Sequence, residues 1–253
     1  MKRSVLITGG GRGIGAATAS VAAGAGWDVA ISFVRDDAAA QAVALAVRAA
    51  GRRAWVQRAD VADDTQVMAL FAGLDAAVAA GQLAPLGGLV NNAGIVDVAC
   101  RVDAMDAARV QRMFAVNVFG SFCCAREAVL RLSTRHGGRG GAIVNVSSVA
   151  ARLGSPGQYV DYAAAKGAID TFTLGLAREV AAEGIRVNAV RPGIIETDIH
   201  ASGGQPERVV QLAPQLPMQR AGSAEEVAAA IVWLLSDAAS YTTGAVLDVS
   251  GGR

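Results

Sequence analysis

The sequence contains little that could support disulfide or metal chemistry. Among 253 residues there are three cysteines, Cys100, Cys123 and Cys124, and two histidines, His136 and His200. An odd number of cysteines, two of them adjacent, makes a poor disulfide framework, and no His or Cys spacing matches a zinc site. We therefore expect free thiols in a reducing compartment, the cytoplasm, and no bound metal.

Net charge and long apolar runs are also lacking. Lys and Arg number 23 and Asp and Glu 22, which gives a net charge of +1. Proteins that bind nucleic acid usually need a strongly basic surface, so nucleic acid is not the expected partner. No stretch approaches the ~18 apolar residues that a membrane helix needs, so no membrane is expected either. The run after Lys2 and Arg3 stops at Thr8, too early for a signal peptide.

Short β-branched runs alternate with longer Ala-rich segments along the whole chain. The expected strands are 5–8, 29–34, 54–59, 88–91, 142–147, 186–191 and 245–249. The expected helices are 14–25, 37–50, 64–79, 107–135, 161–182 and 224–236. This alternation predicts the α/β class, with a parallel sheet covered by helices on both faces. No linker rich in Pro, Ser or charge divides the chain, so one domain is expected over residues 1–253.

A glycine-rich turn, T-G-G-G-R-G-I-G at residues 8–15, joins the first strand to the first helix. Glycines let the backbone turn tightly and approach a pyrophosphate, and the helix N-terminus offers free N–H groups. This position predicts a dinucleotide site. The alternative is a tight turn that only packs the helix closely on the sheet.

The spacing T-G-x-x-x-G-x-G resembles the short-chain dehydrogenase/reductase family. Further segments match that family in its order: Asn91-Asn92-Ala93-Gly94, Asn117, Ser147-Ser148, Tyr162 with Lys166, and Arg191-Pro192-Gly193 with Thr197. The resemblance covers essentially the whole chain. It implies a single-domain, Rossmann-type doubly wound sheet with a nicotinamide dinucleotide at the strand carboxyl ends. It also implies a homotetramer, with the last strand and adjacent helix packed on a partner.

The resemblance implies four catalytic residues, Asn117, Ser148, Tyr162 and Lys166. Tyr162 and Lys166 are four residues apart and share a helix face, so the ammonium can lower the ~4 kcal/mol cost of a phenolate at pH 7. Tyr162 would act as general acid/base, Ser148 would bond the substrate oxygen, and Lys166 would bond the nicotinamide ribose. Asn117 would orient Lys166 through a water. Such a pair alone more often indicates rim packing.

Two neighbouring residues compete for these roles. Ser147 and Ser148 point to opposite faces if both lie on a strand. The spacing to Tyr162 favours Ser148, with one residue inserted relative to the family. Tyr159 is too far from Lys166 in sequence to share its helix face, so we expect Tyr159 at the pocket or its rim.

The end of the second expected strand bears on the choice of dinucleotide. NAD enzymes usually carry an acid there, whereas this chain has Phe33, followed by Arg35. With Arg12 in the glycine turn, this matches the family's NADP-preferring pattern, in which cations meet the 2′-phosphate. We expect NADPH to be preferred over NADH, although Asp36 and Asp37 weigh slightly against it.

The resemblance assigns the remaining contacts to the dinucleotide. Asp60 and Val61 would meet the adenine, unless Asp60 caps the next helix. The expected cofactor-binding residues are Gly9, Gly11, Arg12, Gly13, Ile14, Gly15, Phe33, Arg35, Asp60, Val61, Asn91, Ala93, Gly94, Tyr162, Lys166, Pro192, Gly193, Ile195 and Thr197.

The segment 194–218 interrupts the regular pattern with three prolines and is expected to be a substrate lid. The expected function is NADP(H)-dependent hydride transfer between the nicotinamide and a carbonyl or alcohol substrate, which is a ketone, aldehyde or sugar. The alternatives are a 3-oxoacyl-thioester reductase and a non-catalytic dinucleotide sensor on the same fold.

Overall fold

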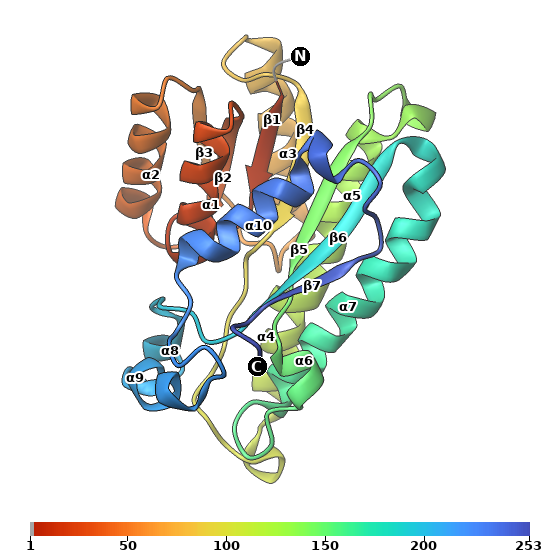
Figure 1. Ribbon diagram of the computed structural model, residues 1–253. Helices are drawn as coiled ribbons and strands as arrows, with labels where there is room; N and C mark the ends of the chain where they lie inside the picture. The colour runs from red at the N-terminus through yellow and green to blue at the C-terminus, as the bar shows by residue number, and fades with distance from the viewer. Residues whose placement is uncertain (1–2) are drawn as a thin grey trace.

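The computed structural model describes residues 3–253, except for the side chain of His200. Seven strands form one parallel sheet in the order β3-β2-β1-β4-β5-β6-β7 (Figure 1). The strands are β1 (Ser4–Ile7), β2 (Asp28–Phe33), β3 (Ala54–Arg58), β4 (Leu86–Asn91), β5 (Gly141–Val146), β6 (Ile185–Pro192) and β7 (Val246–Val249). The predicted doubly wound sheet is confirmed, and each strand lies within two residues of its expected bounds.

Helices cover both faces of the sheet (Figure 1). One face carries α1 (Gly13–Gly24), α2 (Asp37–Ala49) and α10 (Ala224–Leu235), and the other carries α3 (Asp64–Ala79), α5 (Gly120–Leu132) and α7 (Val160–Val180). Successive strand residues point to opposite faces. In β1, Val5 and Ile7 join the hydrophobic cluster under α1 and α10, whereas Leu6 joins the cluster under α3 and α5. Burial on both faces explains why the strands are continuously apolar.

The expected helix over 107–135 is a single stretch of three parts. It comprises α4 (Ala107–Phe114), a π-helical turn η2 (Ala115–Phe119) and α5. By length and composition alone, Ala107–Leu132 could cross a membrane, so the expectation that no stretch approaches this length is wrong. Half of its most apolar window is buried within the fold, as is common for a core helix of a globular protein. The short elements are η1 (Val102–Ala104), η3 (Thr134–His136), α6 (Ala150–Leu153), η4 (Ala181–Glu183) and η6 (Asp237–Ala239).

The expected lid is an excursion between β6 and α10. It contains α8 (Ile199–Ser202), α9 (Arg208–Leu212) and η5 (Ala213–Gln215). Its base is closed by two hydrogen bonds, from Glu196 N to Gly222 O at 3.0 Å and from Gly222 N to Ile194 O at 2.9 Å. Because both ends of the excursion leave the sheet side by side, the segment between them forms a separate cap near the carboxyl ends of the strands (Figure 1).

The sheet reverses its winding between β1 and β4, which are neighbours although two strands separate them in sequence. The chain leaves β1 toward α1 and leaves β4 toward α4. In open α/β sheets, a ligand crevice forms outside the carboxyl ends of the strands at such a point. The glycine-rich turn and Asn91-Asn92-Ala93-Gly94 therefore lie on the two sides of one predicted crevice.

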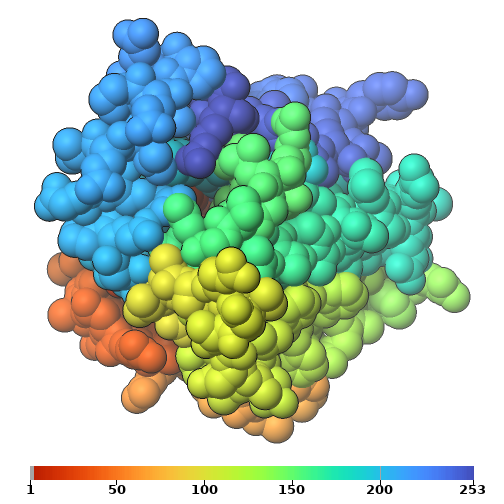
Figure 2. All heavy atoms as spheres, turned by 90° about the horizontal axis from the view of Figure 1, so that it is seen from below, coloured from red at the N-terminus to blue at the C-terminus, as the bar shows by residue number. Residues whose placement is uncertain are grey.

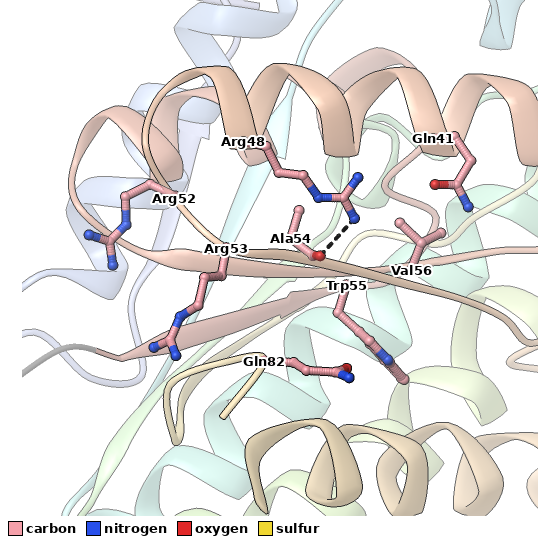
Figure 3. Close-up of a pocket in the computed structure, with 8 residues that line it drawn as sticks. All are labelled: Gln41, Arg48, Arg52, Arg53, Ala54, Trp55, Val56 and Gln82. Atoms are coloured by element: carbon pink, nitrogen blue, oxygen red, sulfur yellow. Dashed lines mark hydrogen bonds between the residues drawn. The ribbon is translucent and has the colours of Figure 1, made fainter. Parts of the chain in front are cut away.

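A second hollow lies at the opposite end of the sheet, beside the edge strand β3 (Figure 3). There Arg52 and Arg53 reach one carboxylate, that of Asp28, at 2.8 Å and 2.7 Å. The Asp28 side chain is 2% exposed and also accepts from Ala84 N. Burial raises the pKa of Asp28, but hydrogen bonds from Arg53 and Ala84 outweigh it and leave the pKa below its ordinary value. These bonds join the start of β2 to the segments before β3 and β4.

Asp28→Asn should lower the free energy of unfolding by about 2–4 kcal/mol, because it removes the acceptor of two guanidinium groups and two backbone N–H groups. The native pKa is depressed, so the loss should be full at neutral pH and shrink as the pH falls through that pKa. Urea denaturation at pH 7 and pH 3.5 checks both statements. The control is Asp237→Asn, which breaks the exposed Arg3–Asp237 pair and should cost under about 0.5 kcal/mol. Equal losses in the two variants would contradict the assignment.

Candidate active site

The glycine-rich turn places the start of α1 at the crevice. Gly9 and Gly13 have φ of 63° and 52°, in the left-handed region that glycine tolerates. A Cβ on Gly15 would lie 2.6 Å from the Gly9 carbonyl oxygen, so only glycine allows this close packing. Arg12 precedes α1 without capping it through its side chain, and the first turn holds no acid. The free N–H groups and positive end of α1 therefore fit a pyrophosphate.

Hydrogen bonds tie this turn to the loop after β4. The Thr8 hydroxyl donates to Val90 O at 3.3 Å and accepts from the backbone N–H groups of Asn92 and Ala93 at 3.0 Å. The Asn92 side-chain amide donates to Thr8 O at 2.9 Å and Gly9 O at 3.1 Å. Thr8 and Asn92 thus brace both sides of the crevice. Both residues lie within the glycine-rich and Asn-Asn-Ala-Gly motifs, but their bracing role depends on contacts between segments more than 80 residues apart.

The side chain of Asn91, one of the expected cofactor-binding residues, points into the protein. Its side-chain amide donates to Asn145 Oδ1 at 2.9 Å and Ser121 O at 3.2 Å, inside the protein. The side chain therefore joins β4 to β5 and α5 rather than reaching the crevice. Ala93 and Gly94 continue along the crevice instead.

The π-helical turn places Asn117 against the same loop. Its fully buried side-chain amide donates to Ile95 O and Met113 O, both at 3.0 Å, and its Oδ1 accepts from Ile95 N at 3.2 Å. A Cβ on Gly94 would lie 2.8 Å from Asn117 Oδ1 and 3.5 Å from Lys166 Nζ. A glycine is therefore needed where Asn117 and Lys166 approach each other.

Lys166 and Tyr162 lie on one face of α7, beside the end of β5. Lys166 Nζ donates to Val146 O at 2.8 Å and lies 5.5 Å from the centroid of the Tyr162 ring. Burial lowers the pKa of Lys166 to about 8, although Asp170 opposes this. Burial raises the pKa of Tyr162 to about 12, opposed by a hydrogen bond from Ser148. At neutral pH this pair holds a proton on the phenol and a partly destabilised ammonium beside it.

The two candidate serines, and likewise the two candidate tyrosines, make different contacts. Ser148 bonds the Tyr162 hydroxyl, whereas the buried Ser147 donates to Lys166 O at 3.2 Å. Tyr159 is buried and donates to Gly203 O of the lid segment at 3.4 Å. The structure therefore brings Ser148, Tyr162, Lys166 and Asn117 together, and places Tyr159 under the lid segment.

Cations lie where a 2′-phosphate is expected. Phe33 ends β2 and packs on the hydrophobic cluster under α1. Arg12 and Arg35 are exposed, and neither forms an ion pair within residues 3–253. Asp36 is occupied as the N-cap of α2, accepting from Ala39 N at 2.9 Å. Arg58, in register with Phe33 on β3, is a further exposed cation that the sequence analysis missed.

The residues expected around the adenine lie at the ends of β3 and α5. Asp60 Oδ1 accepts from Ala62 N at 2.9 Å, whereas Asp63 caps α3 by accepting from Thr65 N at 2.9 Å. The alternative reading of Asp60 as the helix cap is therefore wrong. Val61 is buried against Gly120, where a Cβ would lie 2.7 Å from Val61 Cγ2.

The segment after β6 closes the crevice from the other side. Pro192 ends β6, and a Cβ on Gly193 would lie 2.8 Å from Ser250 Cα. Ile195 is buried at the base of the lid segment. Thr197 crosses to the glycine-rich turn, with its Cγ2 3.3 Å from a Cβ built on Gly13.

The carboxylate, histidine and cysteine side chains within residues 3–253 offer no metal-binding cluster and no reactive thiol. No group of three or more His, Cys, Asp or Glu side chains within residues 3–253 could hold a metal ion. All three cysteines are free thiols. Burial raises the pKa of Cys123 to about 11 and that of Cys124 to about 12, so neither is a ready nucleophile.

A dinucleotide crevice with a Ser, Tyr and Lys cluster beside it defines an oxidoreductase class. A family model described as enoyl-(acyl carrier protein) reductase matches residues 9–253, and the chain belongs to the short-chain dehydrogenase/reductase family. It is 56% identical to the uncharacterized oxidoreductase YgfF of Escherichia coli, over 98% of each chain. It is 41% identical to cis-4-hydroxycyclohexanecarboxylate dehydrogenase of Sinomonas cyclohexanicum, over 99% of this chain and 96% of that one.

A solved structure also resembles this fold. It is a blue fluorescent protein from a metagenomic library in complex with NADPH, with a TM-score of 0.87 and 33% identity. The match covers 99% of this chain and 97% of that chain. The similarity therefore extends over the sheet, the crevice and the lid segment.

Lys166→Met should move the rising limb of the pH profile for alcohol oxidation to higher pH. An ammonium beside the ring favours the phenolate, so its loss should raise the pKa of Tyr162. The measurement is kcat/KM between pH 6 and 11. Lys166→Arg keeps the charge and should shift the limb by much less. An unchanged limb in Lys166→Met would show that the ammonium does not act on the phenol.

Proposed function

We propose that this protein transfers a hydride between NADP(H) and a ketone, aldehyde or sugar carbonyl, or the corresponding alcohol. The observation that carries the proposal is the convergence of Ser148, Tyr162 and Lys166 beside the dinucleotide crevice. When bound there, the nicotinamide supplies or accepts the hydride. The positions of the side chains account for the proton and for the orientation of the substrate.

Tyr162 acts as the general acid in reduction and the general base in oxidation. Ser148, hydrogen-bonded to the phenol, donates to the same substrate oxygen and aligns it. Lys166 contributes its positive charge beside the phenol and bonds the nicotinamide ribose. Asn117 acts through position: it fixes the loop at Ile95 and shapes the space next to Lys166 Nζ.

Tyr162→Phe should lower kcat by about 100-fold or more while NADPH binds within threefold of the wild-type affinity. The ring remains, but the proton donor is lost, and acid–base groups contribute about 10²–10⁴-fold. Turnover is followed by NADPH oxidation over a panel of aldehydes, sugars and diketones, and binding by NADPH fluorescence. Tyr159→Phe is the matched control and should keep more than about a third of the activity. Full turnover in Tyr162→Phe would remove the proposed acid.

The proposed preference for NADP(H) depends on charge. Arg12 and Arg35 have no acidic partner within residues 3–253, and Phe33 replaces the acid that would bond the ribose hydroxyls. A solved relative in complex with NADPH supports the same choice.

The double variant Arg12→Ser with Arg35→Ser should raise KM for NADPH by about 10- to 100-fold and leave KM for NADH within threefold. Charge-assisted bonds to a phosphate have this magnitude. Steady-state kinetics with each nucleotide checks the difference. Arg135→Ser, which removes an exposed arginine elsewhere on the surface, should change neither value. A wild-type protein that uses NADH more efficiently than NADPH would contradict the assignment.

A 3-oxoacyl-thioester reductase is the second candidate, because the matching family model is described by acyl-carrier chemistry. It requires much higher activity on an acyl-carrier thioester than on simple ketones. A non-catalytic dinucleotide sensor is disfavoured because Asn117, Ser148, Tyr162 and Lys166 are all present.

We further propose a homotetramer in the cytoplasm, in which β7 and α10 pack on a partner. Trp233 and Leu247 on these elements are exposed.

A further inference from the structure

Arg208 occupies an unusual electrostatic position at the start of α9. Its guanidinium donates to Gln158 Oε1 at 2.8 Å and to Gln205 Oε1, and its Cζ lies 5.4 Å from the centroid of the Tyr159 ring. All of these partners are neutral. Within residues 3–253 no carboxylate forms an ion pair with Arg208, although Glu207 precedes it in the chain. The guanidinium therefore has hydrogen-bond partners but no counter-charge.

A second guanidinium lies near the first. The Arg253 side chain is partly buried, and both its burial and the charge of Arg208 lower its pKa. The C-terminal segment is held against the lid segment, since Met218 N donates to Gly251 O at 3.2 Å. Like charges close together are unfavourable without an anion between them.

Other arginines around the site are neutralised. Arg191 bonds Asp170 at 2.9 Å and Asp248 at 3.3 Å, and Arg109 bonds Asp161 at 2.8 Å. Not every partly buried arginine is paired in this way, since Arg186 on β6 donates only to backbone carbonyl oxygens of α10 and the segment after it. Beside the site, Arg208 in the lid segment differs from Arg191 and Arg109 because it has no carboxylate partner among residues 3–253.

Arg208 borders the proposed reaction site. Tyr159, under the Arg208 guanidinium, precedes α7, and Tyr162 follows three residues later, a rise of about 5 Å along the helix. Figure 2 shows a small hollow where the lid segment, the C-terminal segment and the segment before α7 meet. A substrate whose carbonyl lies at Tyr162 would extend toward Arg208.

We propose that Arg208 binds a carboxylate of the substrate, so that this protein acts on oxo acids and hydroxy acids. The inference rests on the proposed function, because it names the substrate class of that same site. Arginine suits this role, since its planar fork matches a carboxylate and keeps its charge.

The test compares oxo acids that differ in the number of carbons between the carbonyl and the carboxylate, each paired with its neutral methyl ester. The wild-type protein should prefer the best acid over its ester by about 10- to 100-fold in kcat/KM, the size expected for a charge-assisted contact. Arg208→Gln should abolish that preference by raising KM for the acid, with kcat/KM for the ester changed less than threefold. Arg208→Lys should restore part of it.

Controls separate binding of the carboxylate from support of the lid segment. A purely structural role for Arg208 would lower activity on acid and ester alike, which would overturn the proposal. Arg178→Gln removes an exposed arginine from α7 and should keep the wild-type preference. A wild-type protein that uses acid and ester equally would also overturn it.

A binding measurement distinguishes failure of the subsite from failure of the proposed reaction. Calorimetry with the NADPH complex of Tyr162→Phe should detect the preferred oxo acid, and Arg208→Gln in that background should weaken binding by 10-fold or more. Acid binding that depends on Arg208 without turnover by the wild-type protein would retain the anion subsite and remove the reaction. Turnover of ketones without acid binding would retain the proposed reaction and remove the anion subsite.

Discussion

The hydrogen bonds that join the loop after β1 to the loop after β4 are the constraint on which the site depends. Thr8 and Asn92 make these bonds across the point where the sheet reverses its winding. They hold the start of α1 beside Gly94 and Ile95, and Asn117 then holds Ile95 from the far side. At this point the loops after β1 and β4 lead to opposite faces of the sheet, which leaves a crevice between them. The hydrogen bonds of Thr8 and Asn92 set the width of that crevice.

Burial has opposite effects on the two ionisable groups next to that crevice. It raises the pKa of Tyr162 to about 12 and lowers that of Lys166 to about 8, because a poorly solvated site disfavours either charged form. At neutral pH the phenol keeps its proton, which is the form that a general acid requires. The cation beside the ring then reduces the cost of giving that proton up.

Local sequence patterns predicted the strands and most helices because burial of one or both faces of an element fixes the spacing of its apolar residues. Val5, Leu6 and Ile7 are all apolar because their side chains point alternately into two different hydrophobic clusters. The π-helical turn at Asn117 leaves no such record, since its register depends on contacts with the distant Ile95 loop. Asn91 illustrates the same limit: its partners Ser121 and Asn145 are 30 and 54 residues away, so its inward direction could not be read from its motif. Ser148, Tyr162 and Lys166 could be proposed as one set only through the resemblance to a family.

The residues proposed for catalysis and the arginine proposed for substrate recognition come from different parts of the fold. Ser148, Tyr162 and Lys166 come from the end of β5 and from α7, whose positions follow from the packing of the sheet. Arg208 and the C-terminal segment come from connections outside the sheet, which can change without disturbing the hydrophobic cores. Arg208 nevertheless contacts the start of the catalytic helix through Gln158 and Tyr159. Recognition of a distant carboxylate can thus align the substrate against Tyr162 without altering the groups that transfer the proton.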